Sequence, residues 1–130
     1  YMLDTNIIAY AKNGSPPSVL EKLLACDPSE ICISSITLAE LEYGICNSSN
    51  PDQNRIATMM FLAEMTFLPF DSDAAIAYGD IRFDLKSRAL LIGANDLLIA
   101  AHARSQNLTL VTHNTREFSR VKGLKLVDWV

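Results

Sequence analysis

The chain has 130 residues, of which 49% are hydrophobic, and its formal net charge at pH 7 is −4. This length fits one domain, residues 1–130, and the apolar content excludes a disordered chain. No apolar run approaches the roughly 18 residues of a membrane-spanning helix, and no basic leader precedes the first apolar residues. We therefore expect a cytoplasmic protein with no membrane partner. Tyr1 is not an initiator residue, so we also expect that a few leading residues are missing.

The negative charge is unusual for a nucleic-acid-binding protein, which generally presents a basic surface. Two hypotheses follow. Either the chain binds no nucleic acid, or part of its acidity is a cluster that holds divalent cations, which then meet phosphate groups. The net charge alone leaves both open.

The chain has three cysteines, Cys26, Cys32 and Cys46, and none of them stands in a C-x-x-C pair. Each lies among apolar residues, so we interpret them as small core residues in a reducing compartment. A thiol nucleophile is the alternative.

Short apolar runs alternate along the chain with segments of helical periodicity. We predict strands at residues 1–3, 31–34, 67–70, 108–112 and 124–127. We predict helices around 7–13, from 16 to the Asp27-Pro28 break, after a cap at Ser35, around 55–65, from caps at Asp71 and Asp73 to about 90, and from 95 onwards. The strands are apolar throughout, which is typical of a parallel sheet covered by helices on both faces. The predicted fold class is therefore α/β.

Several polar side chains follow the predicted strands. Asp4 comes directly after the first strand, and Thr112 and Asn114 come after the fourth. Glu40 lies on the second turn after strand two, and Asp96 opens the helix that leads into strand four. Because ligands of open parallel sheets bind beyond the carboxyl ends of the strands, these side chains can converge at one edge.

Crowded carboxylates repel one another unless a cation neutralises them, and hard oxygen ligands suit Mg²⁺ or Mn²⁺. Such ions activate water and stabilise charge on a phosphoryl group, so the expected reaction is phosphodiester hydrolysis. Each acid also has a purely structural interpretation. Asp4 and Asp96 are favoured helix caps, and Glu40 suits a solvated helix face. Spacing alone does not separate Glu40 from its neighbour Glu42.

Four segments together resemble the PIN-domain family, and most closely its VapC toxins of bacterial toxin–antitoxin pairs. They are MLDTNI at 2–7, ISSITLAELEYG at 33–44, IGANDLLIAAHA at 92–103 and VTHNTREFSRVKGLKLVDW at 111–129. The resemblance implies a PIN fold with a central parallel sheet of four or five strands between helices. It also implies Mg²⁺- or Mn²⁺-dependent endoribonuclease activity, with Asp4, Glu40 and Asp96 as metal ligands.

The fourth acidic position departs from the fullest version of the pattern, because many PIN domains carry Asp where this chain has Asn114. An asparagine brings no charge, although its carbonyl can coordinate a metal or a metal-bound water. Close relatives often carry the same NTREF-like run, so we keep Asn114 in the catalytic set. Glu117 is either a ligand at a second metal position or a surface helix residue. Three further residues are expected to orient the carboxylates: Thr5, Asn6 and Thr112.

Two basic groups are candidates for RNA contact. Arg82 and Lys86 share a helix face, where they either meet phosphates or pair with the nearby Asp80 and Asp84. The second group borders the predicted site and is favoured for RNA; it comprises Arg116, Arg120 and Lys122. We expect His102 and Trp129 to be structural, whereas His113 lies near the site and is a weaker candidate for proton transfer.

The resemblance also implies partners. A small antitoxin is expected to insert a segment into the active-site groove, often with an Arg near the acids, and a homodimer is expected through the helices of residues 16–65. Toxins of this type from enteric bacteria act on the initiator tRNA anticodon stem-loop, which makes that RNA the first substrate hypothesis. The alternative is a PIN-like binding module that is weakly active or inactive. A receiver domain is disfavoured, because it would carry paired acids after strand one, where this chain has Asp-Thr-Asn, and a lysine after the last strand, whereas Lys125 precedes the last apolar run. An aspartyl phosphatase is disfavoured, because Asn6 stands where it would carry a second Asp.

Overall fold

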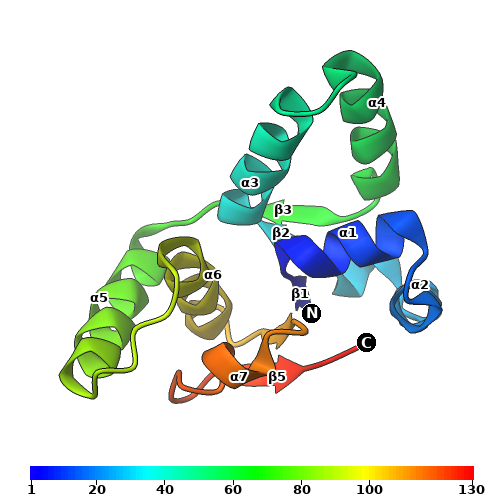
Figure 1. Ribbon diagram of the computed structural model, residues 1–130. Coiled ribbons are helices and arrows are strands. Elements are labelled where there is room, and N and C mark those ends of the chain that lie inside the picture. Colours follow the sequence, from blue (N-terminus) through cyan, green and yellow to red (C-terminus); the bar gives the residue numbers. More distant parts are fainter.

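Each predicted apolar run forms a strand of one parallel sheet in the computed structural model, which describes residues 1–130 (Figure 1). The strands are β1 (Met2–Leu3), β2 (Cys32–Ser34), β3 (Thr66–Leu68), β4 (Thr109–Val111) and β5 (Lys125–Val127). Their order across the sheet is β3-β2-β1-β4-β5, and every neighbouring pair is parallel. The central strand β1 therefore lies beside β4, which brings Asp4 and the segment after β4 to the same edge of the sheet.

Helices connect the strands and cover both faces of the sheet. They are α1 (Thr5–Asn13), α2 (Pro17–Ala25), α3 (Ser35–Cys46), α4 (Pro51–Leu62), α5 (Ser72–Ser87), α6 (Ala94–Ser105) and the one-turn α7 (Thr115–Phe118), with a 3-10 turn, η1, at Pro28–Glu30. Helix α4 begins four residues earlier than predicted, because Asn50 caps it and Pro51 suits the first helical position.

The helix after β2 is capped differently from our prediction. Ser34, not Ser35, is the N-cap of α3, since its Oγ accepts the N–H of Ile36 (3.1 Å). The Ser35 hydroxyl instead accepts the N–H of Phe70 (3.0 Å), which attaches the segment after β3 to the start of α3.

Two hydrophobic clusters lie on opposite faces of the sheet. Met2, Cys32 and Leu110 belong to the cluster covered by α5, α6 and α7, whereas their strand neighbours Leu3, Ile33 and Val111 belong to the cluster covered by α1 and α2. The alternation follows from the period of two along a strand. It fixes the central strands in register, so the residues that follow them are placed at one edge.

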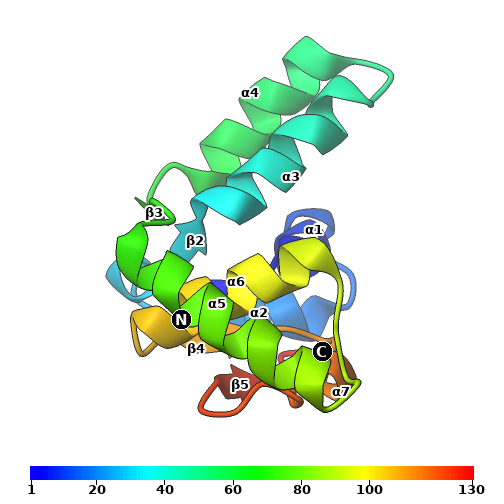
Figure 2. The same cartoon turned by 90° about the vertical axis from the view of Figure 1, so that its left-hand side faces the viewer.

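The outer strand β3 departs from the expectation of strands buried on both faces, since Phe67 is 42% exposed. Helices α3 and α4 pack side by side and project from the body of the molecule (Figure 2). Several large apolar side chains on this hairpin are exposed, among them Tyr43, Ile56 and Met60. No helix is long and apolar enough to cross a membrane.

The cysteine prediction is partly wrong. Cys32 is buried in the core and Cys26 is half-buried, but Cys46 is exposed at the end of α3, and all three thiols are free. Trp129 is a packing residue as expected, because it is buried and meets the Tyr1 ring edge-on with 5.4 Å between ring centroids.

We predict that Phe118→Ala lowers the free energy of unfolding by about 3–5 kcal/mol. Phe118 is 1% exposed and holds α7 on the core, so truncation leaves a cavity. Phe83→Ala is the matched control, because that ring is 77% exposed and its loss should change stability by less than about 0.5 kcal/mol. Urea denaturation of both variants measures the difference, and equal losses would contradict the assignment of Phe118 to the core.

Candidate active site

Asp4 lies where β1 ends and α1 begins. Its backbone N–H donates to the carbonyl of Val111 (3.1 Å), and its Oδ1 accepts the N–H of Ile7 (2.9 Å). Asp4 is thus the N-cap of α1, yet it is also a buried acid. Burial raises the pKa of the carboxyl, and hydrogen bonds from the Thr112 side chain and from the backbone of Ile7 and Asn6 only partly oppose this. Asp4 therefore caps α1, and this role is compatible with the hypothesis that its carboxylate belongs to the active site.

Glu40 projects from α3 toward the start of α1 and the start of α6. Thr5 Oγ1 donates to its Oε1 (2.6 Å), and Asn95 Nδ2 donates to its Oε2 (3.4 Å). Glu42, two residues further on, instead forms an ion pair with Arg55 of α4 (2.8 Å). The contacts therefore separate the two glutamates, which spacing could not do.

Asp96 is the third residue of α6. The N-cap of that helix is Gly93, and no side chain caps it, so the capping interpretation of Asp96 is wrong. Burial, and then the negative charges of Asp4, Glu40 and Glu117, raise the pKa of Asp96 to about 6. Asp96 therefore lies within electrostatic reach of the other three carboxylates, and Asp4 lies within reach of Glu40.

The segment after β4 supplies the last corner. The buried Thr112 accepts the N–H of Asn114 at its Oγ1 (3.0 Å), and Asn114 Nδ2 donates to Glu117 Oε2 (3.1 Å). Glu117 lies on α7 and its charge acts on Asp96. It therefore brings a negative charge to the corner where Asn114 has none.

The four carboxylates come from separate segments: β1–α1, α3, α6 and α7. Neutral donors orient two of them, since Thr5 and Asn95 hold Glu40 while Asn114 holds Glu117. No three His, Cys, Asp or Glu side chains stand in an arrangement that would hold a metal ion. The backbone of Asn6 acts on Asp4, but its side chain makes no hydrogen bond.

Two grooves flank Glu40. One, of about 420 Å³, is lined by residues of α1, α3 and α6 that include Tyr43 and Leu98. The other, of about 290 Å³, extends along α1 toward α4. A third, apolar pocket of about 440 Å³ between α2 and α4 contacts none of the four acids. Both grooves can therefore bring a ligand to Glu40.

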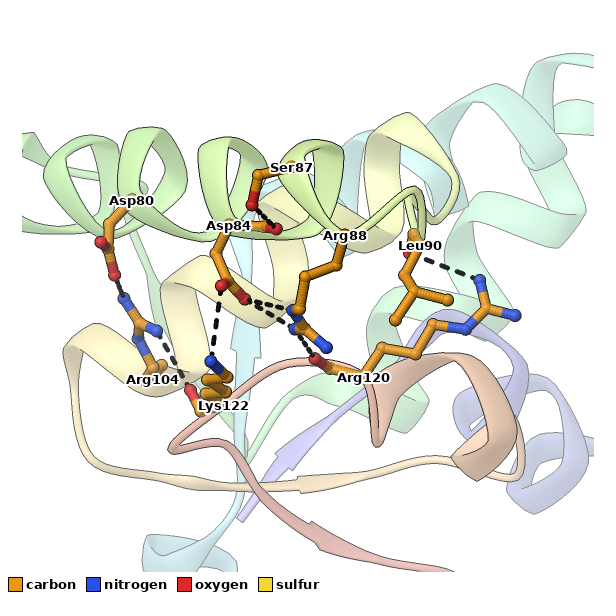
Figure 3. A network of polar contacts seen from close by, with 8 residues as sticks. All are labelled: Asp80, Asp84, Ser87, Arg88, Leu90, Arg104, Arg120 and Lys122. Atoms are coloured by element: carbon orange, nitrogen blue, oxygen red, sulfur yellow. Dashed lines mark hydrogen bonds and ion pairs between the residues drawn. The ribbon is translucent and has the colours of Figure 1, made fainter.

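The ion pairs predicted for Arg82 and Lys86 are wrong. Asp80 pairs with Arg104 of α6 (2.6 Å), and Asp84 is bound by other cations (Figure 3). Arg82 hydrogen-bonds the Tyr78 hydroxyl (2.9 Å), while Lys86 and Arg116 are exposed and form no ion pair. A role of these residues in RNA contact stays a prediction.

Arg88 links α5 to the chain after α7 (Figure 3). Its guanidinium donates to Asp84 (2.6 Å) and to the carbonyl of Arg120 (2.7 Å), and Lys122 approaches the same aspartate (3.6 Å). Arg120 in turn donates to the carbonyls of Leu90 and Leu91 (3.4 and 3.3 Å). These contacts join the loop before α6 to the segment after α7, and these two segments adjoin the helices that carry Asp96 and Glu117. Arg120 therefore fastens the loop before α6, a structural role that the sequence does not reveal.

Neither histidine is directed at the acids. His102 is buried, with its Nδ1 2.7 Å from Ser34 Oγ and its ring edge-on to Phe70, which confirms a structural position. Burial lowers its pKa, against the raising effects of the Asp71 charge and the Pro69 carbonyl. His113 is paired with Asp128 near the end of the chain (3.0 Å).

Sequence reasoning did not single out Asn95 or Lys12 as site residues. Asn95 contacts Glu40, and its only signal is its position next to Asp96. Lys12 lines the groove that also contains Thr5 and Glu40. Its signal is the spacing of seven residues from Thr5, which places both on one face of α1.

Known proteins match this chain over almost its whole length. The PIN domain model matches residues 1–124. The chain belongs to the PIN-domain family. Ribonuclease VapC2 of Rickettsia felis is 45% identical over 130 residues, with 99% of this chain and 97% of that protein covered. The tRNA(fMet)-specific endonuclease VapC of Shigella flexneri is 42% identical over 129 residues, with 99% and 97% covered.

Solved structures agree. The crystal structure of VapBC2 from Rickettsia felis, bound to a DNA fragment from its promoter, has a TM-score of 0.91 at 44% identity, and covers 100% of this chain and 98% of that one. The prediction of a PIN domain of the VapC group, with a parallel sheet between helices, is confirmed.

We predict that Asp96→Asn stabilises the metal-free protein at neutral pH. An unfolded Asp titrates near 4, whereas folded Asp96 titrates at about 6, so the folded state keeps its proton to higher pH. The unfolded state then binds fewer protons than the folded state between pH 4 and 6, and stability falls as pH rises through that window. The raised pKa of Asp4 acts in the same direction.

In a chelator, Asp96→Asn should match the parent near pH 4 and exceed it by about 1–2 kcal/mol at pH 7.5, after allowance for solvent screening. Urea denaturation across this range measures the difference. Parallel stability profiles of the two proteins would contradict the assignment of the raised pKa to Asp96.

We also predict that Arg88→Ala destabilises the protein by about 1–2 kcal/mol, since it removes charge-assisted bonds to Asp84 and to the Arg120 carbonyl. Arg82→Ala on the same helix is the control, with an expected loss below about 0.5 kcal/mol. Thermal and urea denaturation of both variants test this. A loss for Arg82→Ala as large as that for Arg88→Ala would show that the link contributes nothing specific.

Proposed function

We propose that this protein is the toxin of a type II toxin–antitoxin pair and an endoribonuclease that hydrolyses RNA phosphodiester bonds. The observation that carries the proposal is the convergence of Asp4, Glu40, Asp96 and Glu117 at the carboxyl edge of a parallel sheet. Relatives of 37–45% identity over essentially the whole chain are named as VapC ribonucleases, which supports the same reaction.

We propose Mg²⁺ or Mn²⁺ as the cofactor. The chemistry of the donors suits such an ion, because hard carboxylate oxygens are its preferred ligands and because burial, together with the neighbouring negative charges, raises the pKa of Asp96. In the metal-free chain no three of these side chains stand as a ligand set, so the proposal requires them to draw together when the ion binds. Asp4, Glu40 and Asp96 would hold the ion, and Glu117 and the Asn114 carbonyl would serve a weaker second position. When bound, the ion supplies an activated water and stabilises charge on the phosphoryl group. The chain itself orients Glu40 through Thr5 and Asn95, and Glu117 through Asn114.

The substrate we propose first is initiator tRNA, because two of the relatives are named as tRNA(fMet)-specific endonucleases. The partner is a VapB-like antitoxin, as in the solved VapBC complexes. An Arg of that partner placed near the acids would compensate the same charge that a metal ion does. We also propose a homodimer through residues 16–65, where Leu24, Ile56 and Met60 are exposed.

The test is cleavage of initiator tRNA by purified, antitoxin-free protein with Mg²⁺ or Mn²⁺. We expect Asp4→Asn and Asp96→Asn each to lower the rate by about 100-fold or more, because both remove a carboxylate from the cluster. Glu42→Gln is the matched control: its side chain pairs with Arg55 instead, so activity should stay within about twofold of the parent. A chelator should abolish cleavage.

Metal binding has a second measurement that does not need activity. Titration with Mn²⁺ should raise the melting temperature of the parent protein more than that of Asp96→Asn. If the pure protein cleaves no RNA with either ion, the enzyme proposal is wrong and the chain is a PIN-like binding module. Cleavage scattered over many RNAs would reject initiator tRNA as the preferred substrate.

A further inference from the structure

The 290 Å³ groove beside Glu40 runs along one face of α1. Helix α1 contributes Thr5, Ile8, Ala9 and Lys12 to its lining, which are the positions i, i+3, i+4 and i+7 of a single helical face. Lys12 lies two turns from Thr5, or about 10 Å along the helix axis. Since Thr5 is bonded to Glu40, the groove begins at Glu40, one of the four acids, and continues to Lys12.

Lys12 is held in this groove by neutral oxygens. Its Nζ donates to Asn54 Oδ1 (2.9 Å) and to Thr58 Oγ1 (2.7 Å), both on α4, and the buried Thr58 hydroxyl also donates to Asn54 Oδ1 (3.4 Å). Lys12 forms no ion pair. Its position is therefore fixed while its positive charge stays uncompensated.

Other basic side chains bind carboxylates or backbone carbonyls. Arg55, Arg88 and Arg104 are paired with carboxylates at 2.6–2.8 Å. Arg120 is bonded to backbone carbonyls of the loop before α6. Lys12 is thus the one cation that lines a groove together with Glu40, and it is not paired with any carboxylate.

Hydrogen-bond donors are in surplus at the Lys12 end. The Oδ1 of Asn54 accepts two hydrogen bonds, and its Nδ2 group donates none within the protein. An ammonium has three N–H donors, and Lys12 uses two of them. The other polar side chains at this end, such as Asn13, are uncharged. A positive, donor-rich surface of this kind suits an anion with several acceptor oxygens.

We propose that the Lys12 end of this groove is a phosphate subsite, in which Lys12 and Asn54 bind a backbone phosphate of the RNA away from the bond that is cut. The proposal rests on the ribonuclease function and extends it. The groove thereby aligns the strand along α1.

The test measures RNA binding without cleavage. Both proteins carry Asp96→Asn to suppress hydrolysis, and one also carries Lys12→Gln. The probe is a fluorescently labelled RNA that the parent protein cleaves, titrated in Mg²⁺ at several salt concentrations. Lys12→Gln should weaken binding by about tenfold and lower the slope of log Kd against log salt by about 1, because one phosphate contact is lost. In the active background, KM should rise while kcat stays nearly unchanged.

Lys125→Gln is the control, since it removes the same charge from an exposed β5 lysine that lines none of the grooves. It should leave both affinity and slope unchanged. Lys12→Arg keeps the positive charge, so it should retain the RNA affinity and the salt slope of the parent protein. A misfolded variant would retain neither. A melting curve for each variant separates misfolding from weaker binding, because Lys12 also connects α1 to α4.

The proposal is overturned if Lys12→Gln binds RNA with the parent slope, or if Lys125→Gln lowers the slope equally. Unchanged RNA binding together with weaker binding of a co-expressed antitoxin would assign the groove to the protein partner and would also overturn it. If the parent protein cleaves no RNA that could serve as the probe, the ribonuclease function itself fails, and that result is distinct from a failure of Lys12 alone.

Discussion

Four carboxylates at one edge of the sheet repel one another, and the rest of the structure is arranged to hold them there. Asp4 is anchored to β4 through its own backbone, and the sheet that fixes it is buried on both faces. Burial adds to the repulsion by raising the pKa of Asp4 and Asp96. Such a cluster opposes folding, so its presence points to a function rather than to stability.

The hydrogen bonds around the acids orient them without neutralising them. Thr5, Asn95 and Asn114 are neutral donors, and no Lys or Arg forms an ion pair with any of the four acids. An ion pair at Asp96 would have lowered its pKa, whereas the pKa is raised. The geometry thus keeps a negative site available for a cation from outside the chain, whether a metal ion or a side chain of a partner.

The strands and the position of Asp4 could be predicted because apolar runs and caps are local signals. Glu40 and Glu42 could not be separated locally, since the helix that carries them meets α1, α4 and α6 only in the folded chain. The partner of Asp80 was predicted wrongly for the same reason, because Arg104, distant in sequence, reaches it. Asp84 instead takes the local i, i+4 partner Arg88 and, at a longer distance, Lys122. A long-range contact therefore decided the partner of Asp80, whereas at Asp84 one local cation was preferred to others that the spacing also allows.

The acidic net charge is compatible with an RNA substrate once the charges are placed. Four acids form the cluster, and four is also the excess of acidic over basic residues in the chain, so the remaining charges balance. Bound divalent ions would cancel or reverse the local charge where the phosphate is cut. Lys12 supplies a fixed positive charge about 10 Å away along α1. The groove then offers a phosphate two favourable positions with neutral side chains between them, although the protein as a whole is acidic.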